Sequence, residues 1–374
     1  MNTNSNGWHI KSLAEICKIT TGDKDVNEGD VNGDYPFFTC AAEPLRSVSH
    51  SFDGESILLP GNGANVGLVL YYNGKFEAYQ RTYVLNNFSA DVKYVFFHLR
   101  DRWKKSQENK QFGSATNYIR YDNIASYKIP LPPLPIQKQI AEILEKADEA
   151  KQKRKEANKL TDEFLQSVFI EMFGDPVKNP NGFKVVTIGD VISEVRDGPH
   201  VSPNYVNNGI PILSTRNVRP GLLLLDDIKY VSEEHYNYLT RNFKPRKGDV
   251  LLTKGGTTGY AKVVDFEWPF CVWVHIAVLR PKSIIHPRYL ESALNSDHCY
   301  QQSQLYTHGI ANHDLGLTRL IKIKLLLPPY ELQQQFAEIV NKTEALKEKQ
   351  KQSEQELENL FQSLMQKAFK GQLV

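Results

Sequence analysis

The sequence predicts a mixed α and β protein with an internal pseudo-two-fold repeat, in which two α/β domains are joined by two long helices that pair antiparallel as a coiled coil. Three observations support this prediction. The segment from Lys128 to Leu144 returns as the segment from Lys324 to Val340. Apolar residues in both copies follow a helical period, and strand-like alternation precedes each copy. The chain therefore reads as domain, helix, domain, helix.

The two copies keep one register over a long stretch. Their offset is 196 residues (324 minus 128), and it holds without a gap from Gly113 and Gly309 to Ser167 and Ser363. The start of the first copy, at Gly7, matches Gly182 at a shorter offset. We therefore divide the chain into a first domain at 1–130, a first helical segment at 131–176, a second domain at 177–326 and a second helical segment at 327–374.

Each domain begins with strands and then turns helical. Short runs of apolar, aromatic and β-branched residues predict the strands, and a longer run with helical spacing follows them. In the first domain the expected strands are 56–60, 67–72 and 81–85, with a helix near 92–105. In the second domain they are 249–253, 260–264 and 272–279, with a helix near 287–295.

The two long helices have sharp predicted ends. Pro132-Pro133 and Pro328-Pro329 block helix upstream, and Gly174 and Gly371 end the segments. A helix of about 38 residues would span about 57 Å. Stepping by four and three residues from each start gives a seam with a polar middle, typical of paired helices. The residues expected to pair the helices are Ile136, Ile140, Ile143, Phe164, Val168, Leu332, Phe336, Ile339, Leu360 and Leu364.

Composition excludes several classes of protein. With 41% hydrophobic and 24% charged residues, the chain is neither collagen-like nor wholly disordered. No secretory signal or apolar run of about 20 residues is evident, so we expect no membrane contact. Its 4 cysteines, Cys17, Cys40, Cys271 and Cys299, form no C-x-x-C pair, which favours buried free thiols and a cytoplasmic location. The second domain holds 18 Lys and Arg against 13 Asp and Glu, which permits a polyanionic partner.

No catalytic centre is evident in the sequence. The glycine loops at 61–67 and 254–259 match neither phosphate-binding pattern, and tight turns between strands are the favoured interpretation. The motif Leu327-Pro-Pro-Tyr330 resembles an amino-methyltransferase motif, but leucine cannot accept a hydrogen bond from the target amine. His308 and His313 lack the further ligands of a metal site. We therefore expect neither metal nor catalysis in this chain.

The doubled order of motifs resembles the specificity subunit of type I restriction-modification enzymes. The resemblance rests on the two helical copies with the segments Gly33 to Thr39, Asn208 to Val218 and Lys247 to Gly259, and it covers nearly the whole chain. It implies a non-catalytic reader of double-stranded DNA, whose two target-recognition domains each read half of an asymmetric bipartite target. It also implies two modification (methyltransferase) subunits and added restriction subunits as partners. These partners would carry the S-adenosylmethionine, ATP and Mg, and the helices would set the spacer.

Polar residues in and beside the glycine loops, and just before the long helices, are the candidate DNA contacts. Arginine can pair with guanine and asparagine with adenine, and each pairing discriminates by about 1–3 kcal/mol. The first domain supplies Asn62, Asn65, Arg81, Asn117, Tyr118 and Arg120. The second supplies Arg216, Lys254, Thr257, Thr258, His308, Asn312 and His313.

Two alternatives from other classes remain open at this point. A coiled-coil scaffold with two peptide- or protein-binding domains would show the same repeat. An enzyme whose site is not visible in the sequence is the second alternative. Steep salt dependence of duplex binding would separate the first alternative from DNA recognition, and methylation by the chain alone would favour the second.

Overall fold

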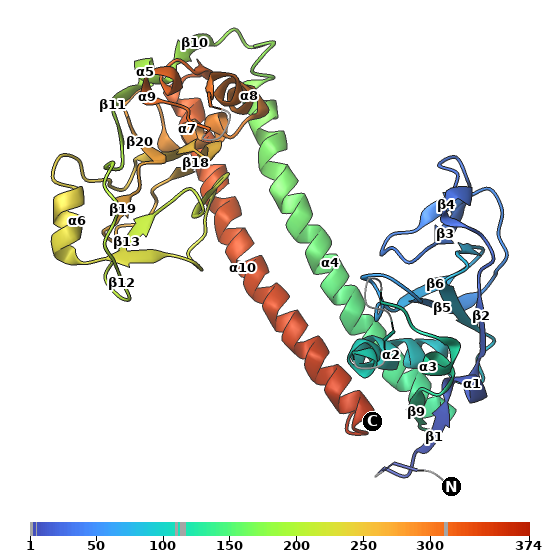
Figure 1. Cartoon of the computed structure of the whole chain (residues 1–374). Helices are drawn as coiled ribbons and strands as arrows, with labels where there is room; N and C mark the ends of the chain where they lie inside the picture. The colour runs from blue at the N-terminus through green and yellow to red at the C-terminus, as the bar shows by residue number, and fades with distance from the viewer. Residues whose placement is uncertain (1–2, 5, 109–110, 113–116, 310–312) are drawn as a thin grey trace. The chain divides into compact units, whose positions relative to one another are not determined.

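The computed structural model describes residues 3–4, 6–108, 111–112, 117–309 and 313–374 (Figure 1). It divides into two compact units. Unit 1 joins residues 1–157 to residues 350–374, and unit 2 is residues 158–349. Each unit therefore combines one domain with the start of one long helix and the end of the other, as a pseudo-two-fold repeat requires.

The domain of unit 1 is built on a four-stranded antiparallel sheet with the order β2-β8-β5-β6. The three-stranded sheet β4-β3-β7 and the pair β1-β9 complete it. Its strands are β1 (His9–Ser12), β2 (Lys18–Thr21), β3 (Tyr35–Phe38), β4 (Leu45–Ser47), β5 (Glu55–Pro60), β6 (Leu70–Asn73), β7 (Glu77–Ala78), β8 (Thr82–Asn86) and β9 (Lys128–Leu131). Its helices before the long one are α1 (Leu13–Ile16), the 3-10 turn η1 (Val26–Glu28), α2 (Val92–Gln107) and α3 (Tyr121–Ala125).

The domain of unit 2 repeats this plan. The sheet β11-β20-β17-β18 corresponds to the four-stranded sheet of unit 1, and the pair β10-β21 corresponds to β1-β9. Its strands are β10 (Lys184–Thr187), β11 (Ile192–Asp197), β12 (Tyr205–Val206), β13 (Ile210–Leu213), β14 (Val218–Arg219), β15 (Leu222–Leu223), β16 (Lys229–Val231), β17 (Val250–Gly255), β18 (Thr257–Val263), β19 (Cys271–Val272), β20 (Ile276–Pro281) and β21 (Lys324–Leu327). Its helices are α5 (Ile188–Val191), α6 (Glu233–Leu239), α7 (Pro287–Leu294), α8 (Asp297–Tyr306) and α9 (Leu317–Leu320).

The second domain is longer than the first, and part of its additional length forms a larger second sheet. Strand β13 pairs with β16 and with β19, and β12 extends this sheet, whereas β3 and its neighbours in unit 1 form a smaller one. The predicted strand at 272–279 was wrong as a single element, because the chain leaves one sheet after β19 and enters another at β20.

The long helices are α4 (Leu134–Phe173) and α10 (Tyr330–Phe369), each of 40 residues. They run antiparallel, and the ion pairs between them obey the repeat. Lys151 pairs with Glu358 at 2.6 Å, and Lys347 pairs with Asp162 at 2.7 Å. Moving by 196 residues converts Lys151 into Lys347 and Asp162 into Glu358. The two ion pairs are therefore equivalent under the repeat.

Two of the residues predicted for the helix seam, Phe164 and Leu360, are largely exposed. Ile140 and Phe336 are buried, but Phe164 is 48% exposed and Leu360 is 50% exposed. Their neighbours Leu165 and Phe361 pack into the cores instead. A straight helix drifts about 20° per seven residues from a strict heptad. Four heptads after Ile136 the drift is about 80°, close to the angle of one residue.

The remaining seam residues lie in or beside the two cores. Ile136, Ile140 and Leu364 belong to the core of unit 1 or pack on it. The core of unit 2 holds or contacts Val168, Leu332, Phe336 and Ile339. Ile143 is partly buried.

All 4 cysteines are free, as expected, but only Cys271 and Cys299 are buried. Burial raises the pKa of each of these two thiols to about 12, so neither is poised as a nucleophile. No helix in the described part of the chain is long and apolar enough to cross a membrane.

Candidate nucleic-acid interface

The glycine loop of unit 1 is bonded to the segment that precedes β9 and the long helix. Gly63 donates its N–H to the carbonyl of Asn117 at 2.8 Å, and Ile119 donates to the carbonyl of Gly61 at 2.9 Å. Between these bonds, Asn62 forms a β-bridge with Tyr118. We call the two segments, 61–67 and 117–119, the first loop pair.

Unit 2 repeats this arrangement bond for bond. Gly256 donates to the carbonyl of His313 at 2.9 Å, and Leu315 donates to the carbonyl of Lys254 at 2.7 Å. Gly255 bridges Asp314 between them. The segments 254–259 and 313–315 form the second loop pair. The structure thus brings together the two groups of residues that the sequence singled out in each domain.

Each loop pair is followed by one further antiparallel residue pair, which we call its hairpin. In unit 1, Phe112 and Tyr118 exchange two backbone hydrogen bonds of 2.9 Å. In unit 2, His308 and Asp314 exchange bonds of 3.0 and 2.9 Å. The residues correspond at the offset of 196, so the same hairpin carries different side chains in the two domains.

Three candidate residues of the first domain border one hollow. Asn62, Arg81 and Tyr118 line a volume of about 350 Å³. The other lining residues are Thr21, Gly61, Gln80, Tyr83 and Ile119. Gly61 is required here, because a Cβ would collide with the carbonyl of Arg81. The hollow is open to solvent and combines an amide, a guanidinium and a phenol.

The other candidates of the first domain have separate environments. The side chain of Asn65 donates to the carbonyl of Cys40 at 2.8 Å, so its amide braces the glycine loop. Asn117 is exposed. Arg120 is exposed beside Tyr118, and its Nη2 donates to the Tyr118 hydroxyl at 3.3 Å.

Two candidates of the second domain point into the protein. The Lys254 side chain is only 6% exposed, and its ammonium pairs with Asp197 at 3.3 Å and with Asp314 at 3.2 Å. Thr258 is 4% exposed and is hydrogen-bonded by Gln304 and Thr307. In this structure Lys254 holds the two segments of the second loop pair together, Thr258 binds side chains at the end of α8, and neither side chain faces solvent.

The other candidates of the second domain that the structure describes are exposed. Thr257 lies at the turn, where Gly255 pairs with Thr257 across β17 and β18, so this glycine loop is the tight turn that its sequence favoured. His308 and His313 lie on the second loop pair and its hairpin. Arg216 is on a separate segment, between β13 and β14, where it pairs with Asp227 at 3.9 Å. Asn312 lies outside the described residues.

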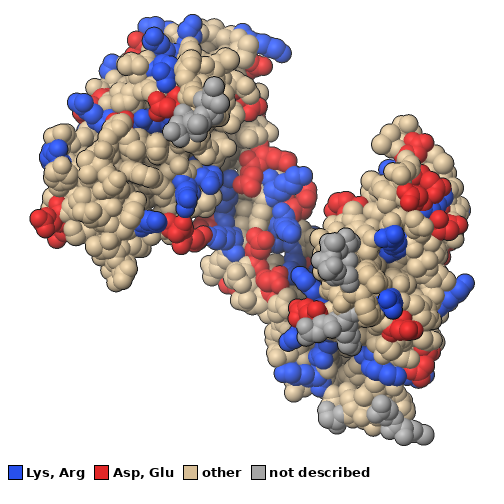
Figure 2. All heavy atoms as spheres, viewed as in Figure 1, with Lys and Arg blue, Asp and Glu red and all other residues tan. Residues whose placement is uncertain are grey.

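Sequence reasoning missed Phe112 and Asp314. Phe112 stacks on Tyr118 with ring centroids 5.6 Å apart, and Asp314 receives both Lys254 and Arg319. Phe112 directly precedes the gapless repeat and Asp314 falls within it, and they are equivalent to His308 and Tyr118, so extending the alignment at the offset of 196 by one residue would have found both. Lys and Arg are interspersed with Asp and Glu over the visible face of each unit (Figure 2). The side chains of the loop pairs therefore mark the candidate interface.

Each domain is fastened to its helix start by a buried glutamine. Gln137 accepts the N–H of Asp91 at 2.9 Å and donates to the carbonyl of Pro132 at 2.7 Å. Gln333 accepts the N–H of His286 at 2.7 Å and donates to the carbonyl of Pro328 at 2.8 Å. Asp91 and His286 cap α2 and α7, so each glutamine ties the first turn of a long helix to a domain helix.

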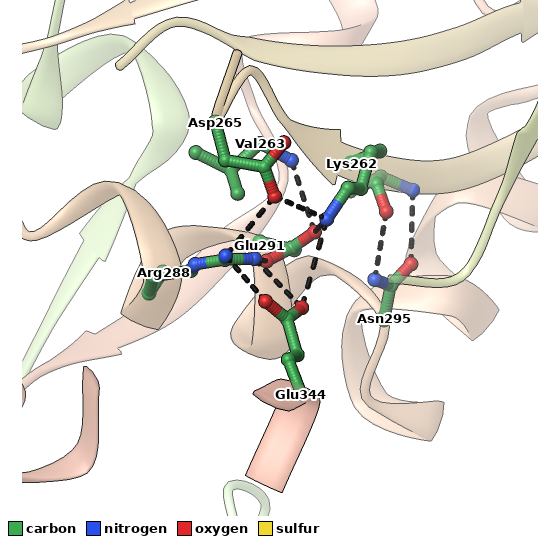
Figure 3. Close-up of polar contacts among 8 residues, drawn as sticks. Lys262, Val263, Asp265, Arg288, Glu291, Asn295 and Glu344 are labelled. Carbon is green, nitrogen blue, oxygen red and sulfur yellow. Dashed lines mark hydrogen bonds and ion pairs between the residues drawn. The ribbon is translucent and has the colours of Figure 1, made fainter. Parts of the chain in front are cut away.

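In unit 2 a buried ionic network adds to this attachment (Figure 3). Arg288 lies between Glu344 of α10, at 2.5 Å, Asp265, at 3.0 Å, and Glu291, at 3.2 Å. Lys262 approaches Asp265 at 3.0 Å and the carboxylates of Glu291 and Glu344 at 3.6 Å. Burial raises the pKa of Glu291, although Lys262 and Arg288 oppose this shift. The network fixes α10 against the domain that carries the second loop pair.

Comparison with known proteins identifies relatives over the whole chain. The model of the type I restriction modification DNA specificity domain matches twice, at residues 5–161 and 180–359. The MjaVIII specificity subunit of Methanocaldococcus jannaschii is 22% identical over 98% of this chain and 93% of its own length. The EcoDI specificity subunit of Escherichia coli is 40% identical, over 37% of this chain and 30% of its own length.

Solved structures share the fold. The S subunit of a type I restriction-modification system from M. genitalium superposes with a TM-score of 0.67 at 16% identity, over 99% of this chain and 98% of that one. A chain from a structural study of assembly and conformational transition in a type I system gives a TM-score of 0.56 at 21% identity, with full coverage of both chains.

Proposed function

This chain belongs to the type I restriction modification DNA specificity family, whose members give such a system its DNA target, and from this membership we propose how the chain reads that target. Each domain reads one half of an asymmetric bipartite site in double-stranded DNA through its loop pair. The single observation that carries the proposal is the duplication of the loop pairs. The same three backbone contacts hold exposed polar residues in both units.

The side chains at the loop pairs suit base edges and phosphates. Amides, guanidinium groups, imidazoles and hydroxyls supply donors and acceptors for direct readout in the grooves. Asn62, Arg81 and Tyr118 offer this chemistry at the first loop pair, and Thr257 and His313 offer it at the second. Because the backbone bonds are alike and the side chains differ, the two domains would read different bases, which makes the target asymmetric.

The helices set the distance between the half-sites in this proposal. A helix of 40 residues spans about 60 Å, enough to separate half-sites by one helical turn of DNA, about 34 Å. The repeated ion pairs, Lys151 with Glu358 and Lys347 with Asp162, support one fixed antiparallel register. A fixed register implies a fixed spacer.

The same helices would dock the catalytic partners. Phe164 and Leu360 are half exposed, correspond at the offset of 196 and present one apolar side chain in each unit. Such an equivalent pair suits two copies of a modification subunit, with restriction subunits added to the assembly. We place the S-adenosylmethionine, ATP and Mg on those partners and assign no catalysis to this chain. The cytoplasm, where the DNA and its partners lie, is the proposed location.

The test is a genome-wide map of adenine methylation in cells that express the chain with its modification subunit, compared with cells that lack the chain. We expect one bipartite motif with a fixed gap, lost on deletion. Methylation that is unchanged by the deletion would contradict the proposal. In that case the scaffold alternative predicts duplex binding that is weak and insensitive to salt, whereas DNA recognition requires a steep loss of affinity as salt rises.

A further inference from the structure

In the first domain the guanidinium of Arg120 stacks against two aromatic rings. The guanidinium carbon of Arg120 lies 4.4 Å from the centroid of the Phe112 ring and 5.8 Å from that of Tyr118. The two rings are themselves stacked, with an interplanar angle of 29°. Phe112 and Tyr118 are 41% and 36% exposed, so the assembly stands at the surface.

The position of the guanidinium is fixed from several sides. The hairpin bonds between Phe112 and Tyr118 hold the rings. The Tyr118 hydroxyl receives Nη2 of Arg120 at 3.3 Å, and the backbone N–H of Arg120 donates to Asn123 Oδ1 at 2.9 Å. An arginine that is stacked in this way keeps its donors in one plane and loses little conformational entropy when they bind.

Arg120 makes no ion pair with any carboxylate in the described part of the chain, whereas Arg100 and Arg319 do. Among the residues that the structure describes, no carboxylate therefore engages the donors it has left. Tyr118, which tethers it, also lines the hollow of the first loop pair. A base edge that entered beside this hollow would meet the guanidinium.

The second domain lacks this device. The positions that correspond to Phe112, Tyr118 and Arg120 at the offset of 196 are His308, Asp314 and Gly316. Asp314 is occupied by Lys254 at 3.2 Å and by Arg319 at 3.5 Å. The stacked arginine is thus a feature of one domain on a hairpin that both domains share.

We propose that Arg120, held on Phe112 and Tyr118, reads a guanine in the half-site of the first domain by donating two hydrogen bonds to its O6 and N7. This inference rests on the proposed function. A planar fork with two parallel donors matches the two acceptors of guanine in the major groove. A phosphate contact needs only a positive charge, so a rigid aromatic mount would add little to it. The half-site of the first domain therefore contains a G·C pair at one position.

The experiment compares variants of the full chain, each assembled with its modification subunit. Binding is measured against duplexes in which the first half-site is randomised and the second is kept. Arg120→Ala should flatten the preference at one G·C position by roughly 5- to 150-fold and leave the other positions unchanged. Arg120→Lys keeps the charge without the fork, so it should lose most of the same preference. Phe112→Ala should weaken the preference less, because the tether to Tyr118 remains.

Arg241→Ala is the matched control. Arg241 stacks on Tyr238 at 4.2 Å, a similar contact placed just after α6 in unit 2 and outside both loop pairs. It should leave the first half-site unchanged. A uniform loss of affinity in Arg120→Ala, with a smaller salt dependence and every base preference retained, would show a phosphate contact and overturn the inference. If wild type itself lacked a bipartite preference, the proposed function would fail first.

Discussion

The two domains are attached to their helices by the same latch but by different charges. In both units a buried glutamine binds the cap of a domain helix, and a tyrosine, Tyr94 or Tyr289, donates to a carbonyl just before the long helix at 2.7 or 2.8 Å. Around this latch, unit 1 has two half-exposed ion pairs, Lys93 with Glu145 and Arg100 with Asp148. Unit 2 has the buried network centred on Arg288.

The difference is localised, because Asp148 and Glu344 are the same position of the repeat. In unit 1 this carboxylate meets a single arginine, with 31% and 21% of the two side chains exposed. In unit 2 it meets Arg288, which is 10% exposed, and Lys262, which is 7% exposed. A duplicated frame can thus keep its geometry through neutral hydrogen bonds while its charged contacts diverge.

The largest effect should follow from removing the central cation of the network. Arg288→Met leaves Glu291 buried beside Lys262 alone, and breaking a buried pair in this way costs about 3–5 kcal/mol. The matched change in unit 1, Arg100→Met, breaks a partly exposed pair and should cost about 1 kcal/mol or less. Hydrogen exchange of the α7 and α2 amides measures each cost in its own unit.

Equal losses of amide protection in Arg288→Met and Arg100→Met would contradict the proposed difference between the two domain–helix attachments. Glu344→Gln provides a finer control, because it removes one charge of the network but keeps a hydrogen-bonding side chain against Arg288. It should lower α7 protection less than Arg288→Met does. A larger loss of α7 protection in Glu344→Gln than in Arg288→Met would mean that Glu344 of α10, and not Arg288, contributes most to the network.

A second prediction concerns the buried glutamine that both domain–helix attachments share. Gln137→Leu and Gln333→Leu each leave a partly buried N–H and a buried carbonyl without their partner, at a cost of about 1–3 kcal/mol. Because the bonds are equivalent, the two variants should destabilise α2 and α7 by similar amounts in the same exchange experiment. Unequal costs would mean that the network, and not the latch, carries most of the attachment in unit 2.

The sequence predicted the repeat, the long helices and most of the central strands. Proline pairs and terminal glycines set the helix ends, so Leu134–Phe173 and Tyr330–Phe369 fall close to the expected segments. It failed at Phe164 and Leu360, because a seam counted in heptads assumes a supercoil, whereas a helix closer to straight turns the next position, Leu165 or Phe361, inward and leaves these two exposed. Short strands such as β13 and β19 gave no clear period, since two to four residues are too few to show one.

The candidate site was only partly predictable. The glycine loops and the segments before the helices stood out as polar and repeated, but their pairing depends on backbone bonds between residues about 60 positions apart. Burial also separated residues of the same type. Lys254 turns inward to Asp197 and Asp314, while Arg120 stays outside. No property of one position in the sequence distinguishes these two cations.

The smallest expected effect lies in the middle of the helices. Lys151→Ala and Lys347→Ala each remove one ion pair whose acidic partner is substantially exposed, so each should cost about 1 kcal/mol or less. Lys151 should show the larger loss, because its ammonium also lies 4.3 Å from the centroid of the Phe361 ring. Thermal unfolding of the two variants checks the order, and a larger loss in Lys347→Ala would reverse it.

The central claim is that one frame holds two independent readers. The most direct test replaces residues 177–326 with the second domain of another member of the family and maps adenine methylation in cells that also express the modification subunit. The account predicts that one half-site changes while the other half-site and the gap between them are retained. A change in both half-sites, or in the gap, would contradict it.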